Sequence, residues 1–331
     1  MANAEQLKAL VKSHIERDDR HFYSVAMQVA AREAKVGHGK LAEELRDMID
    51  AAKARVSPDN SEGKLVPLVR PRGELVNLLT VSYPKNRLAD MVLDAEIAEQ
   101  LGRIMKEQKH HLRIREHGLS PRRKLLLVGP PGTGKTMTAS VLAGELGIPI
   151  FAVRLDALIT KFIGETAAKL RQIFDAINEV RGVYFFDEFD AIGSQRGLAN
   201  DVGEIRRVLN SFLQMIESDQ SHSLIVAATN HVEILDYALF RRFDDVIEYR
   251  LPSAPQAAKL LQSRLGKFAP KPFPLKAITA KAEGLSYAEI KRAVDESIKE
   301  AVMHDEERVK ADVLARAFDE RRKFSLRINN K

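Results

Sequence analysis

Residues 129–136 read Gly-Pro-Pro-Gly-Thr-Gly-Lys-Thr, which fits the pattern G-x-x-x-x-G-K-[ST]. This loop constrains the fold because it works between a buried strand and a helix, where backbone N–H groups and the helix N-terminus face a bound anion. The apolar run at 124–128 predicts that strand, and the pattern over 136–146 predicts that helix. The chain is therefore expected to bind the phosphates of a nucleotide on an α/β scaffold.

Each position of the loop has its own physical task. Gly129, Gly132 and Gly134 allow the backbone to curl around phosphate oxygens. Lys135 supplies a positive charge for the β- and γ-phosphates, and the Thr136 hydroxyl is a ligand for Mg²⁺. We therefore expect ATP and Mg²⁺ as cofactors. The residues expected to contact the nucleotide are Gly129, Pro130, Pro131, Gly132, Thr133, Gly134, Lys135, Thr136 and Met137.

Composition excludes several classes of protein. The chain has 331 residues and no cysteine, so a disulfide framework, a thiolate metal site and a cysteine nucleophile are all excluded. Its 52 basic and 46 acidic residues are well mixed, which does not favour a nucleic-acid-binding stripe. No apolar run approaches the ~20 residues that a membrane span needs. These features predict a soluble cytoplasmic protein without a membrane span.

The sequence divides into four regions. Residues 1–56 carry helical patterns and predict a small N-terminal domain, and 57–84 predict a linker. Residues 85–251 are expected to form the nucleotide-binding domain, and 252–331 a small helical domain. The N-terminal helical patterns cover 4–17, 19–35 and 39–55, and the C-terminal ones cover 255–268, 275–283, 286–303 and 310–323.

Strand and helix patterns alternate through the central region. The predicted strands are 125–128, 150–153, 183–186, 224–228 and 246–249. Such alternation implies a parallel sheet that helices cover on both faces. The predicted fold class is therefore α/β: a three-layer sandwich with a parallel sheet, preceded by a small helical domain and followed by a small all-helical one.

Two of the predicted strands end in polar residues. The apolar run 183–186 is followed by Asp187 and Glu188, and the run from 224 ends in Asn230. Ligands of a parallel sheet gather at the carboxyl ends of its strands, where the phosphate loop also lies. Asp187 is therefore a candidate Mg²⁺ partner, and Glu188 is a candidate base for a water aimed at the γ-phosphorus. Asn230 is a candidate for orienting that water.

The order of these segments resembles the AAA family of ATPases. The segments at 129–136, 185–188, 227–230 and 238–243 follow one another like that family's Walker A, Walker B, sensor 1 and arginine-finger segments. The resemblance covers roughly residues 85–305. It implies a P-loop ATPase domain followed by a helical lid domain.

The resemblance assigns a role to Arg241 and Arg242. They stand where AAA proteins such as spastin and katanin carry arginine fingers. A guanidinium of this kind reaches a neighbouring subunit's nucleotide and stabilises charge on the γ-phosphoryl group. Since such an arginine does not serve its own subunit, the resemblance implies a ring, expected to be a homo-hexamer.

The segment Lys-Phe-Ile-Gly-Glu at 161–165 resembles the first pore loop of AAA unfoldases. Phe162, with Ile163 beside it, is then the residue expected to grip a protein substrate. In the alternative interpretation, Phe162 begins the following helix and packs in the core. Residues 197–204 fall at the position of a second pore loop, although they carry no distinctive pattern.

Two further segments are placed by the resemblance. Residues 284–290, Gly-Leu-Ser-Tyr-Ala-Glu-Ile, resemble the sensor 2 segment, with Ala288 near the nucleotide and Tyr287 in place of the more usual glycine. Residues 88–93 occupy the position of the adenine-contacting segment, with the backbone of Met91 and Val92 as the expected contacts.

The leading hypothesis is an ATPase ring that remodels, unfolds or threads a protein substrate. The N-terminal helices would recruit that substrate or an adaptor, and a separate protease could use the ring. The sequence contains neither His-Glu-x-x-His nor Gly-x-Ser-x-Gly, so proteolysis by this chain itself is not expected. Two alternatives remain open: a nucleic-acid-dependent loader or initiator ATPase, and a regulatory ATP switch that threads nothing.

Overall fold

The computed structural model describes residue 71, residues 73–158, 163–189, 198–234 and 237–329, and scattered positions between 25 and 47. The chain separates into two compact units, Met1–Pro67 and Leu68–Lys331. In the first unit the described residues 25–27, 29–30, 40, 42–44 and 47 are helical, and Val25, Ala30 and Ala42 are buried. The rest of the three predicted N-terminal helices lies outside the described residues.

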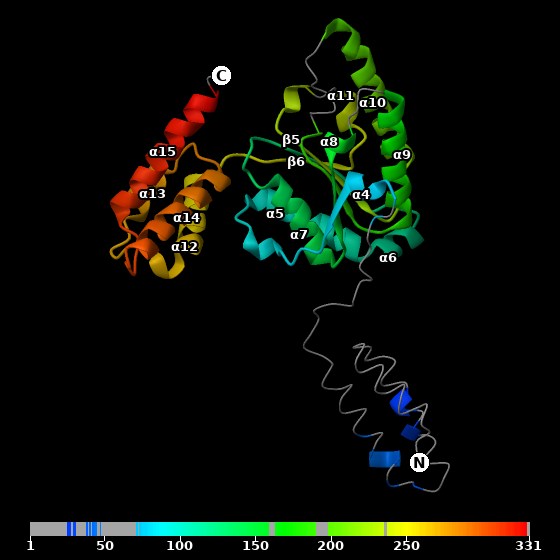
Figure 1. Ribbon diagram of the computed structural model, residues 1–331, viewed down its shortest axis with the longest axis horizontal. Coiled ribbons are helices and arrows are strands. Elements are labelled where there is room, and N and C mark those ends of the chain that lie inside the picture. The colour runs from blue at the N-terminus through cyan, green and yellow to red at the C-terminus, as the bar shows by residue number, and fades with distance from the viewer. Residues whose placement is uncertain are drawn as a thin grey trace. The chain divides into compact units, whose positions relative to one another are not determined.

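The second unit is built on a mixed six-stranded sheet with the order β1-β3-β4-β5-β2-β6 (Figure 1). Its strands are β1 (Leu79–Ser82), β2 (Lys124–Val128), β3 (Ile150–Val153), β4 (Val183–Phe186), β5 (Leu224–Thr229) and β6 (Asp245–Glu248). The strands β3, β4, β5, β2 and β6 are parallel, and each lies within one residue of its predicted position. The edge strand β1, which the sequence did not predict, pairs antiparallel with β3, so the sheet is mixed although the predicted strands are parallel to one another.

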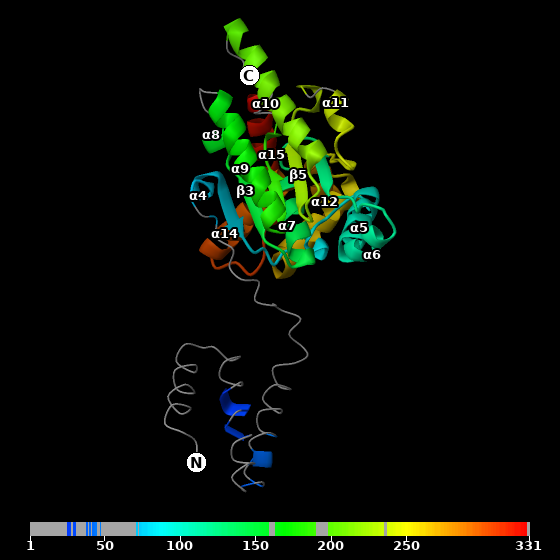
Figure 2. The same cartoon turned by 90° about the vertical axis from the view of Figure 1, so that its right-hand side faces the viewer.

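Helices cover both faces of this sheet (Figures 1 and 2). Successive residues of β2 point to opposite faces: Leu126 and Val128 pack in one core cluster, and Leu125 and Leu127 in the other. The two-sided burial explains why the central strands read as unbroken apolar runs. The helices of this region are α4 (Leu75–Leu78), α5 (Ala95–Lys109), α6 (His111–Glu116), α7 (Lys135–Leu146), α8 (Leu155–Leu158), α9 (Ile163–Glu179), α10 (Leu198–Ser218) and α11 (Tyr237–Phe240).

The C-terminal helices pack around a core of their own. They are α12 (Ala254–Leu265), α13 (Leu275–Lys281), α14 (Tyr287–Met303) and α15 (Ala311–Asn329). Buried Leu261, Ile290 and Phe318 belong to this separate cluster. At the start of α14, Ser286 and Glu289 form a capping box, in which each side chain accepts a hydrogen bond from the other residue's backbone N–H. The α/β sandwich and the helical region after it are thus confirmed, while the exact domain boundaries stay predictions.

None of the described helices combines the length and the apolar composition that a bilayer span requires.

Candidate nucleotide-binding site

The phosphate loop follows β2 directly and leads into α7. Gly129, Gly132 and Gly134 all have positive φ, at 139°, 75° and 106°. A Cβ at Gly129 would lie 2.2 Å from the carbonyl oxygen of Tyr249, and one at Gly132 would lie 2.6 Å from Ser286 Oγ. Glycine is therefore required at these two positions both by backbone conformation and by the neighbouring atoms.

The Lys135 side chain lies inside the loop. It is 6% exposed, and its Nζ donates to the carbonyl oxygens of Gly129 at 2.7 Å and Pro130 at 2.8 Å. A buried ammonium group at the start of a helix is a favourable partner for phosphate oxygens. The loop residues thus fit the nucleotide that the sequence motif implies.

The carboxyl end of β4 brings two acidic residues to the loop. The Thr136 hydroxyl donates to Asp187 Oδ2 at 2.8 Å, although these residues are 51 positions apart. A hydroxyl and a carboxylate are oxygen ligands of the kind Mg²⁺ prefers, and the ion commonly completes its shell with waters and phosphate oxygens. Thr136 and Asp187 therefore fit a Mg²⁺ ion bound together with ATP.

Glu188 has an unusual backbone conformation. Its φ is 50°, in the left-handed region, which costs a residue with a Cβ about 1–2 kcal/mol. The side chain is exposed, and its backbone N–H donates to Asp187 Oδ1 at 3.0 Å. Such strain concentrates at functional sites, and here it fits the expected role of Glu188 in activating a water.

Asn230 lies at the same edge of the sheet. In the parallel register of β2 and β5, Val128 pairs with Thr229. The phosphate loop begins directly after Val128, and Asn230 directly follows Thr229, so Asn230 lies beside the start of the loop. On its other side β5 pairs with β4, which ends next to Asp187. The topology thus places Asn230 between the loop and the acidic pair.

The C-terminal helical region also reaches the phosphate loop. The backbone N–H of Ala288 donates to the carbonyl oxygen of Gly132 at 3.0 Å. On the opposite flank, Met91 Cε lies 3.3 Å from where a Cβ at Gly134 would stand. Two predicted nucleotide contacts, Ala288 and Met91, are therefore adjacent to the loop. Val92 and Met137 are half-buried.

Comparison with known proteins identifies the family. A family model described as "ATPase family associated with various cellular activities (AAA)" matches residues 125–251. A protein of Sinorhizobium fredii named "Uncharacterized AAA family ATPase y4kL" is 36% identical over 97% of this chain and 96% of its own length. The chain belongs to the AAA family of ATPases. It is therefore an ATP hydrolase.

Two other AAA relatives are similar over about two thirds of this chain. ATP-dependent zinc metalloprotease FtsH 3 of Sphaerobacter thermophilus is 34% identical over 68% of this chain. Proteasome-activating nucleotidase of Aeropyrum pernix is 35% identical over 69% of it. The matches span only 47% and 58% of those two proteins.

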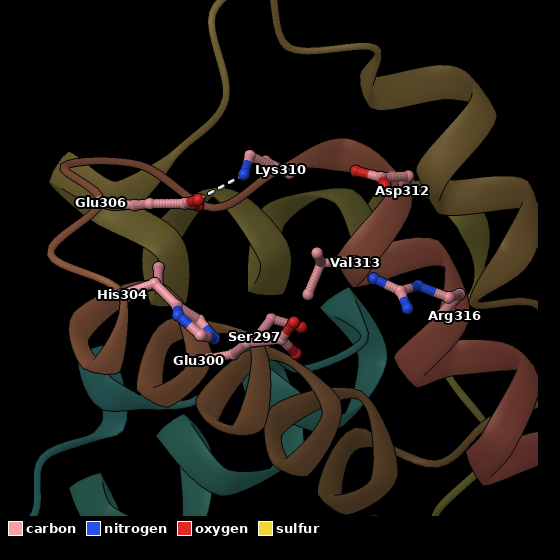
Figure 3. Close-up of a pocket in the computed structure, with 9 residues that line it drawn as sticks. Ser297, Glu300, His304, Glu306, Lys310, Asp312, Val313 and Arg316 are labelled. Carbon is pink, nitrogen blue, oxygen red and sulfur yellow. Dashed lines mark hydrogen bonds and ion pairs between the residues drawn. The ribbon is translucent and has the colours of Figure 1, made fainter.

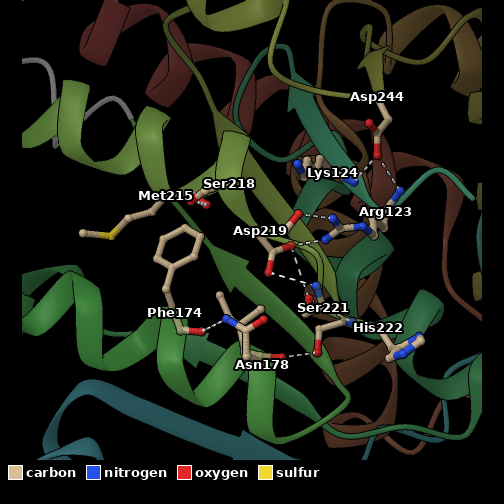
Figure 4. Close-up of polar contacts among 12 residues, drawn as sticks. Arg123, Lys124, Phe174, Asn178, Met215, Ser218, Asp219, Ser221, His222 and Asp244 are labelled. Carbon is tan, nitrogen blue, oxygen red and sulfur yellow. Dashed lines mark hydrogen bonds and ion pairs between the residues drawn. The ribbon is translucent and has the colours of Figure 1, made fainter. Parts of the chain in front are cut away.

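The arginine pair of this AAA chain lies on the turn between α11 and β6. Arg241 is exposed, whereas Arg242 is partly buried and its Nε lies 3.3 Å from Glu217 Oε2. Two residues further on, Asp244 Oδ2 accepts the backbone N–H groups of Arg123 at 2.8 Å and Lys124 at 2.9 Å (Figure 4). These bonds attach the turn to the start of the strand that carries the phosphate loop.

The expected AAA pore-loop residues are only partly described. Phe162 lies outside the described residues, and Ile163 is the first residue of α9. The helix α10 already begins at Leu198, so the expectation of a second pore loop over 198–204 is wrong, and residue 197 lies outside the described part. Further along this helix, Val208, Phe212, Leu213 and Ile216 are buried.

Several cavities lie among the described residues, and two of them concern the phosphate loop and the helical domain. One, of about 320 Å³, lies beside the phosphate loop and is lined by Asp94, Thr133, Tyr249 and Tyr287 among others. Burial, with the negative charge of Asp94 as a smaller cause, raises the pKa of Tyr287. The other, of about 490 Å³, is formed by α14, α15 and the turn between them, with Glu300, Lys310 and Arg316 in its wall (Figure 3).

Sequence reasoning missed Tyr249 and Thr138 in this site. Tyr249 follows β6, is 2% exposed, and its hydroxyl lies 2.5 Å from Thr138 Oγ1 on α7. Neither residue belongs to a motif, and only the strand order, which places β6 beside β2, brings them together.

Proposed function

We propose that this AAA ATPase works as a ring of identical subunits, expected to be a hexamer, that uses ATP hydrolysis to remodel or thread a protein substrate. The observation that carries the proposal is the convergence of Lys135, Asp187, Glu188 and Asn230 at one edge of the sheet, with an exposed arginine on a separate turn. The first set equips a subunit to bind and cleave ATP. The exposed arginine is suited to contact the ATP bound by a neighbouring subunit.

Each site residue has a role in this proposal. Lys135 binds the β- and γ-phosphates, while Thr136 and Asp187 hold Mg²⁺, which offsets phosphate charge when bound. Asn230 orients the attacking water, and the Glu188 carboxylate accepts its proton. Arg241 and Arg242 of the adjacent subunit stabilise the charge that develops on the transferred phosphoryl group. Met91, Val92, Met137 and Ala288 surround the base and sugar.

The names of two relatives support a protein substrate. One is a metalloprotease and the other is named for activating the proteasome. Because the present sequence carries no His-Glu-x-x-His pattern, a separate protease is a partner consistent with these names. The helical unit at 1–56 is proposed to recruit the substrate or an adaptor.

The test is whether an unfolded protein, such as casein, raises the ATP turnover of the assembled chain, with single-stranded DNA and RNA in parallel. We expect stimulation by protein, and we expect Phe162→Ala to lose it while basal turnover is kept. Phe324→Ala removes an aromatic side chain that is 54% exposed on α15 and serves as the control. Stimulation by nucleic acid alone would support a loader, and stimulation by neither would support a switch.

A further inference from the structure

The buried contact between Tyr249 and Thr138 connects the end of β6 to the helix behind the phosphate loop. The two hydroxyl oxygens are 2.5 Å apart, and the residues are 2% and 0% exposed. The Thr138 hydroxyl also donates to the carbonyl oxygen of Gly134 at 3.1 Å. Since a hydroxyl has one proton, Tyr249 then donates to Thr138, and a chain of hydrogen bonds runs from Tyr249 to the last glycine of the loop.

The backbone of Tyr249 contacts the other end of the same loop. Its N–H donates to the carbonyl oxygen of Val128 at 2.7 Å. Its own carbonyl oxygen lies against Gly129, where an added Cβ would approach to 2.2 Å. Tyr249 therefore contacts the first glycine through its backbone and the last glycine through Thr138.

The same residue stands where the chain leaves the sheet for the helical domain. Only the segment 250–253 separates Tyr249 from α12, which begins at Ala254. That domain contacts the middle of the loop through the Ala288 N–H, which donates to Gly132. The loop is thus held from β6 and from the helical domain, and Tyr249 belongs to the connection between them.

Stability alone does not account for the two hydroxyls. Two apolar side chains of similar shape fill a buried position at little or no cost, whereas the buried Tyr249 hydroxyl needs a hydrogen-bond partner, which Thr138 provides. A hydrogen bond fixes distance and direction, which apolar packing does not. We propose that Tyr249 is a positioning residue for ATP, which acts through Thr138 and Gly129 to hold the phosphate loop in its binding conformation.

The ionisation of Tyr249 agrees with this role. Burial raises the pKa of its phenol far above the ordinary value of 10. The phenol therefore remains a proton donor at every pH at which the protein would work. The inference rests on the assignment of the loop as the ATP site, and not on the ring or on threading.

The test compares Tyr249→Phe with Tyr184→Phe, a matched control. Tyr184 is fully buried, and its hydroxyl donates to the carbonyl oxygen of Ala176 at 2.7 Å. Both variants lose one buried hydroxyl, so both are expected to melt at a lower temperature. Only Tyr249→Phe is expected to weaken binding of a fluorescent ADP analogue, by about three- to tenfold, the range of one hydrogen bond.

Steady-state kinetics separate positioning from a structural role. We expect Tyr249→Phe to raise KM for ATP by a similar factor and to change kcat less than twofold, because binding is what the loop position sets. Thr138→Val should reproduce this effect, whereas Thr138→Ser should retain wild-type affinity for nucleotide. The double variant Tyr249→Phe/Thr138→Val should bind nucleotide no more weakly than either single variant, because both substitutions break the same hydrogen bond.

An ADP affinity within threefold of wild type in both Tyr249→Phe and Thr138→Val, with melting temperatures lowered as in Tyr184→Phe, would overturn the proposal. If Tyr249→Phe does not fold, the comparison of ADP affinity between Thr138→Val and Thr138→Ser tests the proposal by itself. Retained ADP binding in Lys135→Ala would instead contradict the assignment of the loop itself, so the two failures are distinguishable.

Discussion

The hydroxyl of Thr136 donates a 2.8 Å hydrogen bond to Asp187, which joins the helix after the phosphate loop to the acidic residues that follow β4. This contact brings a phosphate-binding group and two carboxylates to one point on the sheet. Substitutions of the residues gathered there should therefore separate ATP binding from ATP cleavage.

Lys135→Ala should lose nucleotide affinity. Removal of the buried ammonium group deletes the charge that faces the phosphates, and one charge-assisted contact is worth about 10- to 100-fold in affinity. Calorimetric titration with ADP measures the change. Lys259→Ala, which removes an exposed lysine on α12, is the control and should bind normally. Wild-type affinity in Lys135→Ala would refute the phosphate role of this residue.

Glu188→Gln should bind ATP and hold it uncleaved. The amide keeps the size of the side chain but does not accept a proton from water, so we expect kcat to fall by about 10²–10⁴-fold with little change in affinity. Phosphate release and nucleotide retention are measured together, with Glu116→Gln on the surface of α6 as control. Full turnover in Glu188→Gln would remove its assignment as the base.

The double variant Arg241→Ala/Arg242→Ala should inhibit wild-type subunits when the two are mixed. Its defect acts on the neighbour's ATP, and loss of an arginine finger costs about 10³–10⁵-fold in rate. Turnover of mixtures, plotted against the fraction of variant, should fall below the line of simple dilution. Points that follow that line would contradict action between subunits.

Asp219→Asn should destabilise the ATPase domain strongly. Asp219 is 5% exposed and pairs with the Arg123 guanidinium, which is itself buried, at the amino ends of the strands (Figure 4). Breaking a buried pair leaves an uncompensated charge and costs about 3–5 kcal/mol. Urea unfolding measures the loss. Asp295→Asn, whose partner Arg264 is half-exposed, should cost less than about 1 kcal/mol.

The sequence predicted the central strands well because burial on both faces leaves unbroken apolar runs such as Val183–Phe186. It did not predict β1, since Leu79–Ser82 is a short edge strand with two exposed residues and its partner β3 comes some 70 residues later. A pairing of that kind is a property of the assembled sheet rather than of the local pattern.

The residues of the candidate site likewise divide into those that the sequence predicted and those that it did not. Gly129, Lys135 and Asp187 belong to motifs, and their spacing revealed them. Tyr249 was missed because a lone tyrosine after a strand resembles any core residue, and its contact with Thr138 spans 111 positions. The start of α10 at Leu198 was also missed, because residues 197–204 carry no distinctive pattern.

The most direct test of the central claim, that each ATP is cleaved by one subunit with an arginine from the next, is turnover per subunit across a dilution series. Light scattering on the same samples records the state of assembly. We predict that turnover per subunit collapses as rings dissociate into single chains. Undiminished turnover in samples that contain only single chains would contradict the claim.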